Sequence, residues 1–201
     1  PLSLWSDVHA QILSRLIESG AKVVGPDLLW ELEPDSVLTL GPDMVPLRDK
    51  LLQAEVTMAM LAGSESMVIG AHLDEGRLNL PRESLRAMAG KWIGLLNLQQ
   101  DENGVVRRYG IETSVEQKDS NYEWPSFGYA LALLADGSDA IEIPSENGYF
   151  WLNYRGGPQS FPYVSAASVL NPDYVLEVED KIVLYGPYDA RLGDLVRSPF
   201  S

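Results

Sequence analysis

The sequence contains no cysteine, which excludes disulfide bridges and cysteine metal sites and leaves the redox compartment open. Histidine is nearly absent as well. The only two, His9 and His72, lie far apart in the chain, whereas metal sites usually use histidines in close pairs. A site made of carboxylates alone stays open, but no spacing supports it. We therefore expect no metal and no cofactor.

Basic residues are scarce, since 15 Lys and Arg stand against 29 Asp and Glu, and the formal net charge is −14 over 201 residues. Such a surface repels phosphate-rich partners, which argues against nucleic acid and against an anionic membrane surface. No run of about eighteen apolar residues occurs, and residues 1–5 lead directly into an amphipathic segment. The sequence predicts neither a signal peptide nor a spanning helix within itself.

Common catalytic motifs are also missing. Neither glycine-rich phosphate loop, G-x-x-x-x-G-K-[ST] or G-x-G-x-x-G, is present, which excludes the common nucleotide sites. Gly63-Ser-Glu-Ser-Met67 lacks the second glycine of an esterase elbow, and Asp101-Glu-Asn-Gly104 lacks the later glutamate of a calcium loop. With 29 carboxylates some pair must lie close in space, so an acidic hydrolase that uses paired carboxylates stays open as an alternative.

Apolar spacing and glycine stops divide the first half of the chain into alternating helices and strands. Helices are predicted over 6–19, 47–62 and 81–89, and strands over 21–25, 67–71 and 92–97. Pro26 cannot donate to a sheet ladder, so the first strand should end at Gly25 or bulge at Pro26. The alternation of helix and strand is typical of an α/β fold.

In the second half antiparallel pairing is expected. The turn signal Asp101-Glu-Asn-Gly104 predicts a hairpin between 92–97 and 105–111. The remaining predicted elements are a helix over 125–135, a strand over 149–154, a helix over 165–170 and a strand over 181–186. Together they predict a single α/β domain over 1–201, with a mixed, mostly parallel sheet, helices on both faces and antiparallel hairpin additions. Because parallel sheets are built from strand-helix-strand units, we also expect a strand upstream of Pro1.

Ligands of open α/β sheets bind where parallel strands finish, and strand ends supply most of the candidate residues. The candidate ligand-binding residues are Asp27, His72, Asn153, Arg155, Tyr188 and Asp194. The favoured alternative for Asp27 and Asp194 is that they accept hydrogen bonds from loop amides. His72 equally fits an ordinary histidine at a strand edge.

The stretch from 149 to 165 combines a strand, an arginine, glycines and aromatic residues. Apolar side chains alternate on both sides of 149–154, which predicts a strand that is covered on both faces. Arg155 follows, just before Gly156-Gly-Pro158. Its five donors can tie neighbouring carbonyls or carboxylates, or bind an anion, and tying loops is the favoured interpretation.

Several segments in a fixed order resemble the CHASE type 2 domain, the second type of the cyclases/histidine kinases associated sensory extracellular domains. They are His9-Ala, Gly20-Ala-Lys-Val-Val-Gly25, Asp101, Gly104-Val-Val-Arg-Arg108, Asn153-Tyr-Arg-Gly-Gly-Pro158, Phe161-Pro, Lys181-Ile-Val-Leu-Tyr-Gly186 and Gly193-Asp-Leu. The resemblance covers nearly the whole chain and is weakest over 31–66 and 112–148.

The resemblance implies a bacterial sensor domain outside the cytoplasmic membrane, periplasmic or extracellular. Such a domain is held between transmembrane helices and joined to a histidine kinase, nucleotide cyclase or Ser/Thr kinase output. It also implies that the chain itself is no enzyme, that the receptor is a homodimer, and that the signal is a small molecule or another stimulus. The family usually carries an apolar strand before the position of Pro1 and residues beyond Ser201, so we expect trimming at both ends. A ligand-free dimerisation module is the main alternative.

Overall fold

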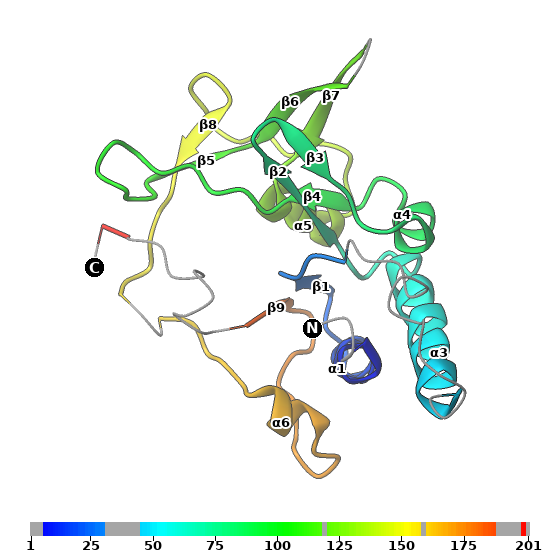
Figure 1. The fold of residues 1–201 in the computed structure, drawn as a ribbon. Coiled ribbons are helices and arrows are strands. Elements are labelled where there is room, and N and C mark those ends of the chain that lie inside the picture. Colours follow the sequence, from blue (N-terminus) through cyan, green and yellow to red (C-terminus); the bar gives the residue numbers. More distant parts are fainter. Residues whose placement is uncertain (1–5, 31–44, 118–119, 158–159, 188–197, 200–201) are drawn as a thin grey trace.

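The computed structural model describes residues 6–30, 45–117, 120–157, 160–187 and 198–199. In chain order its elements are α1 (Ser6–Glu18), β1 (Val23–Pro26), α3 (Val45–Ala62), β2 (Ile69–Asp74), β3 (Arg77–Asn79), α4 (Glu83–Ala89), β4 (Ile93–Leu95), β5 (Arg108–Gly110), β6 (Glu112–Gln117), β7 (Ser120–Pro125), α5 (Phe127–Asp136), β8 (Tyr149–Trp151), α6 (Ala166–Leu170) and β9 (Ile182–Tyr185). Helices and several small sheets of mixed pairing make an α/β fold (Figure 1).

Helix α1 forms and ends as its sequence predicts. Its apolar stripe, which includes Ile12 and Leu16, is buried in the larger core cluster. Gly20 has a φ of 87°, a left-handed conformation that glycine adopts without steric cost. In this turn the amide of Gly20 donates to the Ile17 carbonyl and the amide of Ala21 to the Leu16 carbonyl, which satisfies the helix end.

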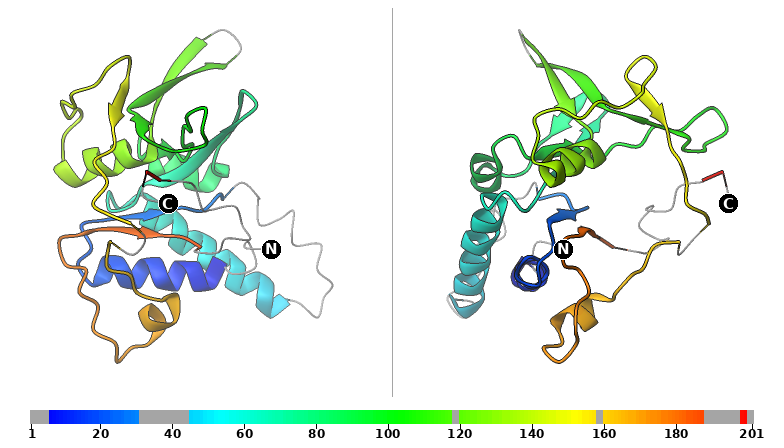
Figure 2. Two further views of the ribbon diagram at one scale, coloured as in Figure 1. Left: turned by 90° about the vertical axis from the view of Figure 1, so that its left-hand side faces the viewer. Right: turned by 180° about the vertical axis from the view of Figure 1, so that it is seen from behind.

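Strand β1 lies between two layers of helices. Val23 is buried in a cluster with Phe127 and Leu131 of α5, whereas Val24 packs into the larger cluster that contains α1 and α3 residues. Neighbouring side chains of a strand point to opposite faces, so both faces of β1 are covered. The two views of the ribbon agree that α5 and α1 lie on opposite sides of β1 (Figure 2). Helices therefore cover both faces of β1.

Strand pairing is divided among small sheets. Strand β1 is parallel to β9, β2 is parallel to β4 and antiparallel to β3, and the pairs β5–β8 and β6–β7 are antiparallel. Single parallel bridges join Val24 to Met67 and Leu95 to Ser126. The expected single sheet, large and mostly parallel, is therefore not confirmed.

Pro26 explains why pairing between β1 and the chain before β2 stops after one bridge. The Val24 amide donates to the Ser66 carbonyl at 2.8 Å, and the Val68 amide donates to the Val24 carbonyl at 3.1 Å. The next donor along this edge of β1 would be the nitrogen of Pro26, which carries no hydrogen. Pro26 nevertheless stays in the strand, aligned with Tyr185 of β9, so β1 neither ends before it nor bulges.

The hairpin predicted across the turn at Asp101 is wrong. Both edges of β4 are already occupied, because β2 pairs along one edge and Leu95 bridges to Ser126 on the other. Strand β5 pairs with β8 instead. The turn signal itself does form a turn, in which the Asp101 amide donates to the Val105 carbonyl at 3.0 Å. The hairpins that do form, β2–β3 and β6–β7, were not predicted.

Helix α3 is apolar on more than one face. Leu51 and Met58 are buried against the core, while Leu52, Val56 and Met60 are exposed. None of the helices in the described part of the chain combines the length and the apolar character that crossing a membrane requires.

Candidate functional site

Asp27 directly follows β1, whereas His72 lies inside β2, just after the residues of β2 that are parallel to β4. Asp27 follows β1, its side chain is exposed, and its amide donates to the Tyr185 carbonyl of β9 at 2.7 Å. His72 is half-buried in β2, opposite Asn79 of β3. At the same edge the Asn97 side chain bonds both the amide and the carbonyl of Leu73 at 2.8 Å, which fixes the chain as it leaves β4.

The other candidates lie elsewhere or outside the described residues. Asn153 and Arg155 are exposed beyond β8. The Arg155 guanidinium lies 5.8 Å from the centre of the Phe161 ring and makes no hydrogen bond within the described part of the chain. Arg155 thus contacts a ring and does not tie loop carbonyls as the sequence suggested. Tyr188 and Asp194 lie outside the described residues.

Strand β8 is not covered on both faces, contrary to the prediction. It pairs with the short strand β5, and the side chain of Trp151 is 67% exposed. Only one face of this pair packs inward. There Tyr109 and Phe150 meet edge to face with centroids 5.9 Å apart, and the Tyr109 hydroxyl accepts a hydrogen bond from the Gly128 amide of α5.

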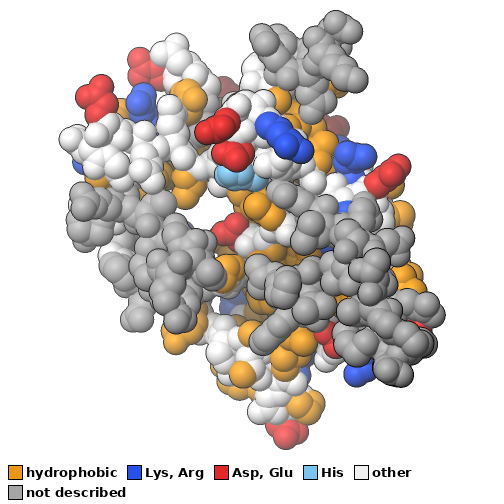
Figure 3. Space-filling view, in the orientation of Figure 1, with side chains coloured by type: hydrophobic (Ala, Val, Ile, Leu, Met, Phe, Trp, Pro, Cys, Tyr) orange, Lys and Arg blue, Asp and Glu red, His pale blue; other side chains and the backbone are white. Residues whose placement is uncertain are grey.

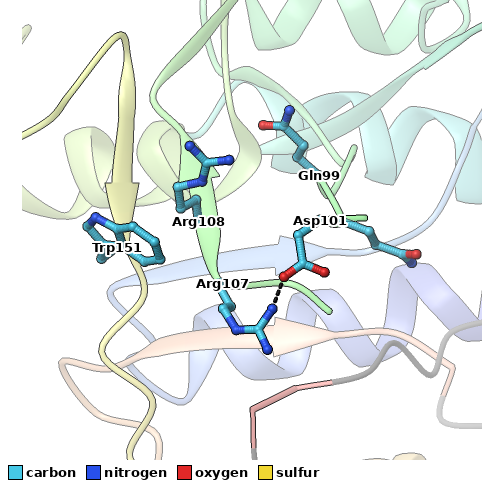
Figure 4. Close-up of a pocket in the computed structure, with 6 residues that line it drawn as sticks. Gln99, Asp101, Arg107, Arg108 and Trp151 are labelled. Atoms are coloured by element: carbon cyan, nitrogen blue, oxygen red, sulfur yellow. Dashed lines mark ion pairs between the residues drawn. The ribbon is translucent and has the colours of Figure 1, made fainter. Parts of the chain in front are cut away.

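The outward face of the β5–β8 pair borders a pocket, which we call the Arg108 pocket. It has a volume of about 90 Å³ and is lined by Gln99, Gln100, Asp101, Arg107, Arg108 and Trp151. Gln99, Gln100 and Asp101 belong to the loop that follows β4, so the pocket forms at the carboxyl end of a parallel strand. Figure 4 shows the side chains of Arg108 and Trp151 on neighbouring segments, with β1 and β9 running behind them. The space-filling view shows an opening below the β5 segment and beside β1 (Figure 3).

Asp101 is held rigidly at one side of the Arg108 pocket. Its Oδ1 accepts hydrogen bonds from the amides of Asn103 and Val105, at 2.9 and 3.0 Å. Its Oδ2 is ion-paired with the Arg107 guanidinium, as the dashed line in Figure 4 marks. The Asp101 carboxylate therefore stabilises the turn through its hydrogen bonds, and the guanidinium of Arg107 neutralises its charge.

Arg108 holds a different position. It lies directly opposite Trp151 in the β5–β8 register. Its guanidinium carbon is 5.7 Å from the Trp151 ring centre and 5.9 Å from that of Tyr149, within the range of cation–π attraction. No carboxylate in the described part of the chain pairs with it. The pocket thus presents one guanidinium without a counter-charge, beside an exposed indole ring.

A second cavity, of about 170 Å³, tests the paired-carboxylate alternative. Two carboxyl groups, Glu112 and Asp139, are among its lining residues. Asp139 lies 2.5 Å from the Lys91 ammonium, and that hydrogen bond and charge lower the pKa of the Asp139 carboxyl. A general acid needs the opposite shift. Within the described ranges no group of three or more His, Asp or Glu side chains could hold a metal ion.

A family model described as the CHASE2 domain matches residues 2–201. The chain belongs to the CHASE2 family. CHASE2 domains are extracellular sensory domains of signalling receptors, and the family is not a catalytic one. No curated protein and no solved structure matches the chain.

In this CHASE2 domain none of the candidate residues that were named from the sequence and that the structure describes lines the Arg108 pocket. Arg107 and Arg108 belong to the strand predicted over 105–111 and to the segment Gly104-Val-Val-Arg-Arg108 of the resemblance, and neither was selected as a candidate for ligand binding. Two adjacent arginines after a tight turn are conspicuous in a chain with a net charge of −14, and that signal could have selected them. Trp151 gave no such signal, because its strand looked buried.

Proposed function

We propose that residues 1–201 form one extracytoplasmic input domain of a bacterial transmembrane receptor and that a small molecule bound in the Arg108 pocket is its signal. The receptor output would be a histidine kinase, a nucleotide cyclase or a Ser/Thr kinase. The observation that carries the proposal is a sensor-family chain with a polar pocket at the carboxyl end of β4. Open α/β sheets place ligands at this edge.

The pocket is lined by three separate segments of the chain. One wall is the loop after β4, and the others are β5 and β8. Beyond β8 the Tyr154 hydroxyl donates to the Val106 carbonyl at 2.7 Å, and the chain then continues to α6. Helix α6 packs against α1, and Arg15 of α1 donates to the Tyr174 carbonyl at 2.9 Å. A ligand that binds one arrangement of these walls better than another would shift the receptor between two states.

A thermal-shift screen of this chain with anions, sugars and amino acids at millimolar concentrations tests the proposal. A ligand that binds only the folded state increases the free energy of unfolding by mass action, by about 2.7 kcal/mol when its concentration is a hundred times its Kd. The melting temperature rises as a result. We expect at least one compound to raise the melting temperature of the wild-type chain and not that of Trp151→Ala. A screen in which every class leaves the melting temperature unchanged would contradict ligand sensing.

A second candidate function, dimerisation of the receptor, is favoured by the exposed stripe of α3. Leu52, Val56 and Met60 follow one another at intervals of four residues and are 44%, 60% and 66% exposed. Between 51 and 62 the only charged residue is Glu55, which is ion-paired with Arg82. Two copies with a net charge of −14 each can approach with little repulsion only through such an uncharged face. We propose that a second copy of the chain packs here.

Substitution of Val56 by Glu tests this pairing, because two facing carboxylates would repel at the centre of the stripe. Sedimentation should show a wild-type dimer and a monomeric Val56→Glu variant. Leu98→Glu is the matched control, since it places the same charge on an exposed apolar residue of the loop after β4, outside α3. A wild-type chain that stays monomeric, or a Leu98→Glu variant that dissociates equally, would remove α3 as the interface.

A further inference from the structure

The Arg108 pocket carries an excess of one positive charge in a strongly acidic chain. Its charged lining residues are Asp101, Arg107 and Arg108, and Asp101 is already committed to Arg107 and to two turn amides. The charge that remains uncompensated is that of Arg108. A ligand with a single negative charge would neutralise the pocket, whereas a cation would meet Arg108 directly.

Arg108 also keeps its hydrogen-bonding capacity. The contacts with the rings of Tyr149 and Trp151 use the positive charge of the guanidinium and take up none of its N–H groups in conventional hydrogen bonds. A guanidinium presents those donors as a planar fork that matches a carboxylate. The two rings fix the position of the fork before any ligand arrives, which reduces the entropy lost on binding.

The volume of the Arg108 pocket and the exposed ring of Trp151 limit which ligands can bind. A volume of about 90 Å³ is well below the roughly 300 to 1,000 Å³ of pockets that enclose drug-sized ligands. The pocket can therefore enclose only a head group. The exposed ring of Trp151 offers a flat apolar surface at its mouth, against which the rest of the ligand can pack.

We propose that the Arg108 pocket binds a small monocarboxylate with an aromatic or other flat apolar body. The carboxylate accepts hydrogen bonds from the Arg108 fork, with the side-chain amides of Gln99 and Gln100 as further donors, and the body lies against Trp151. This inference rests on the proposed sensory function and specifies its ligand. Phosphate and sulfate are the competing anions, and they lack the apolar body.

Calorimetric titration of this chain with three benzene derivatives tests the charge requirement. Benzoate, benzamide and benzylamine share the ring and differ in carrying a negative, no or a positive charge, and inorganic phosphate supplies an anion without a ring. We expect benzoate to bind and the other three to bind at least about tenfold more weakly, because only benzoate forms the charged fork and the ring contact. Benzamide or phosphate binding as tightly as benzoate would overturn the inference.

Two matched variants locate the binding. Arg108→Gln should weaken benzoate binding by about 10- to 100-fold, the range expected for hydrogen bonds to a charged group. Arg86→Gln removes the same charge from an exposed position of α4 outside the pocket and should change the affinity by less than about twofold. If both variants lost the same share of benzoate affinity, benzoate would be attracted by the overall charge of the chain alone, and binding in the Arg108 pocket would be refuted.

A spectroscopic readout separates failure of this inference from failure of the sensory function. Benzoate should shift the indole N–H resonance that Trp151→Leu removes from the NMR spectrum. If a neutral compound raises the melting temperature and shifts this resonance while benzoate does neither, the sensory function stands and the carboxylate inference falls. If no compound of any class does either, both fall.

Discussion

Removal of the Glu55 charge should destabilise the fold strongly, because Glu55 neutralises a buried arginine. The side chain of Arg82 is 3% exposed and that of Glu55 13%. Arg82 donates from Nε to Oε1 of Glu55 at 2.7 Å and from Nη2 to Oε2, so the pair is bidentate. Ser84 donates a further hydrogen bond to Oε1, and the Trp30 ring lies 5.7 Å from the guanidinium. The pair ties α3 to the start of α4.

The magnitude follows from the burial. Glu55→Gln keeps the shape of the side chain but leaves the guanidinium of Arg82 without a counter-charge, and broken buried pairs cost about 3 to 5 kcal/mol. A domain of this size has a free energy of unfolding of about 5 to 15 kcal/mol, so the variant should lose a large share of its stability. Replacement of both partners by Met should cost less than either single change, because no buried charge is then left unpaired.

Urea denaturation of the wild type, Glu55→Gln, Arg82→Met and Glu55→Met/Arg82→Met measures these differences, with Glu55→Met completing the double-mutant cycle. Asp139→Asn is the control. This substitution breaks the ion pair with Lys91. The Asp139 side chain is 90% exposed and the Lys91 side chain 63%, so the unfolding transition should stay unchanged. The reasoning fails if Glu55→Gln costs less than about 1 kcal/mol, or if the effects of the two Met substitutions simply add.

Two further predictions concern a histidine and a glycine. Burial lowers the pKa of His9 below its usual 6.5, although the charge of Asp7 opposes the shift. As the pH falls, the imidazole of the unfolded chain is therefore protonated before that of the folded chain. Stability should fall as the pH drops below about 6.5, and unfolding curves should show this loss reduced in His9→Gln but kept in His72→Gln. In Gly94→Ala the new Cβ would lie 2.5 Å from the Phe127 Cα, so we expect a loss of about 1 to 3 kcal/mol in thermal unfolding.

The elements that could be predicted from the sequence are those whose formation depends on residues close together in the chain. Helix α1 has its apolar stripe and its glycine stop within twenty residues, and the predicted bounds of 6–19 agree with Ser6–Glu18. The cap of α6 is equally local, since the Ser165 side chain accepts a hydrogen bond from the Ser168 amide. Strands β1 and β9 were found because their apolar runs are short and bounded.

Strand pairing could not be predicted in this way, because it depends on which edges are already occupied. The turn at Asp101 forms, yet the strands on its two sides do not pair, since Ser126 occupies the edge of β4. Pro26 has no N–H to donate to the chain before β2, so pairing on that side of β1 stops. On the other side Pro26 stays aligned with Tyr185 of β9, so β1 itself continues. Its effect on the sheet could be seen only once its neighbours were known.

The Arg108 pocket shows the same limit at the level of function. The rule for strand ends predicts only which edge of a parallel sheet holds a ligand, and it does not say which side chains meet there. Arg108 and Trp151 meet only through the β5–β8 register, which joins positions far apart in the chain. The strand that holds Trp151 looked buried because both of its sides are apolar, but the side chain opposite Trp151 is a cation and the ring stays exposed. The contact between an exposed aromatic ring and an arginine on the neighbouring strand therefore becomes visible only when the strand partner is known.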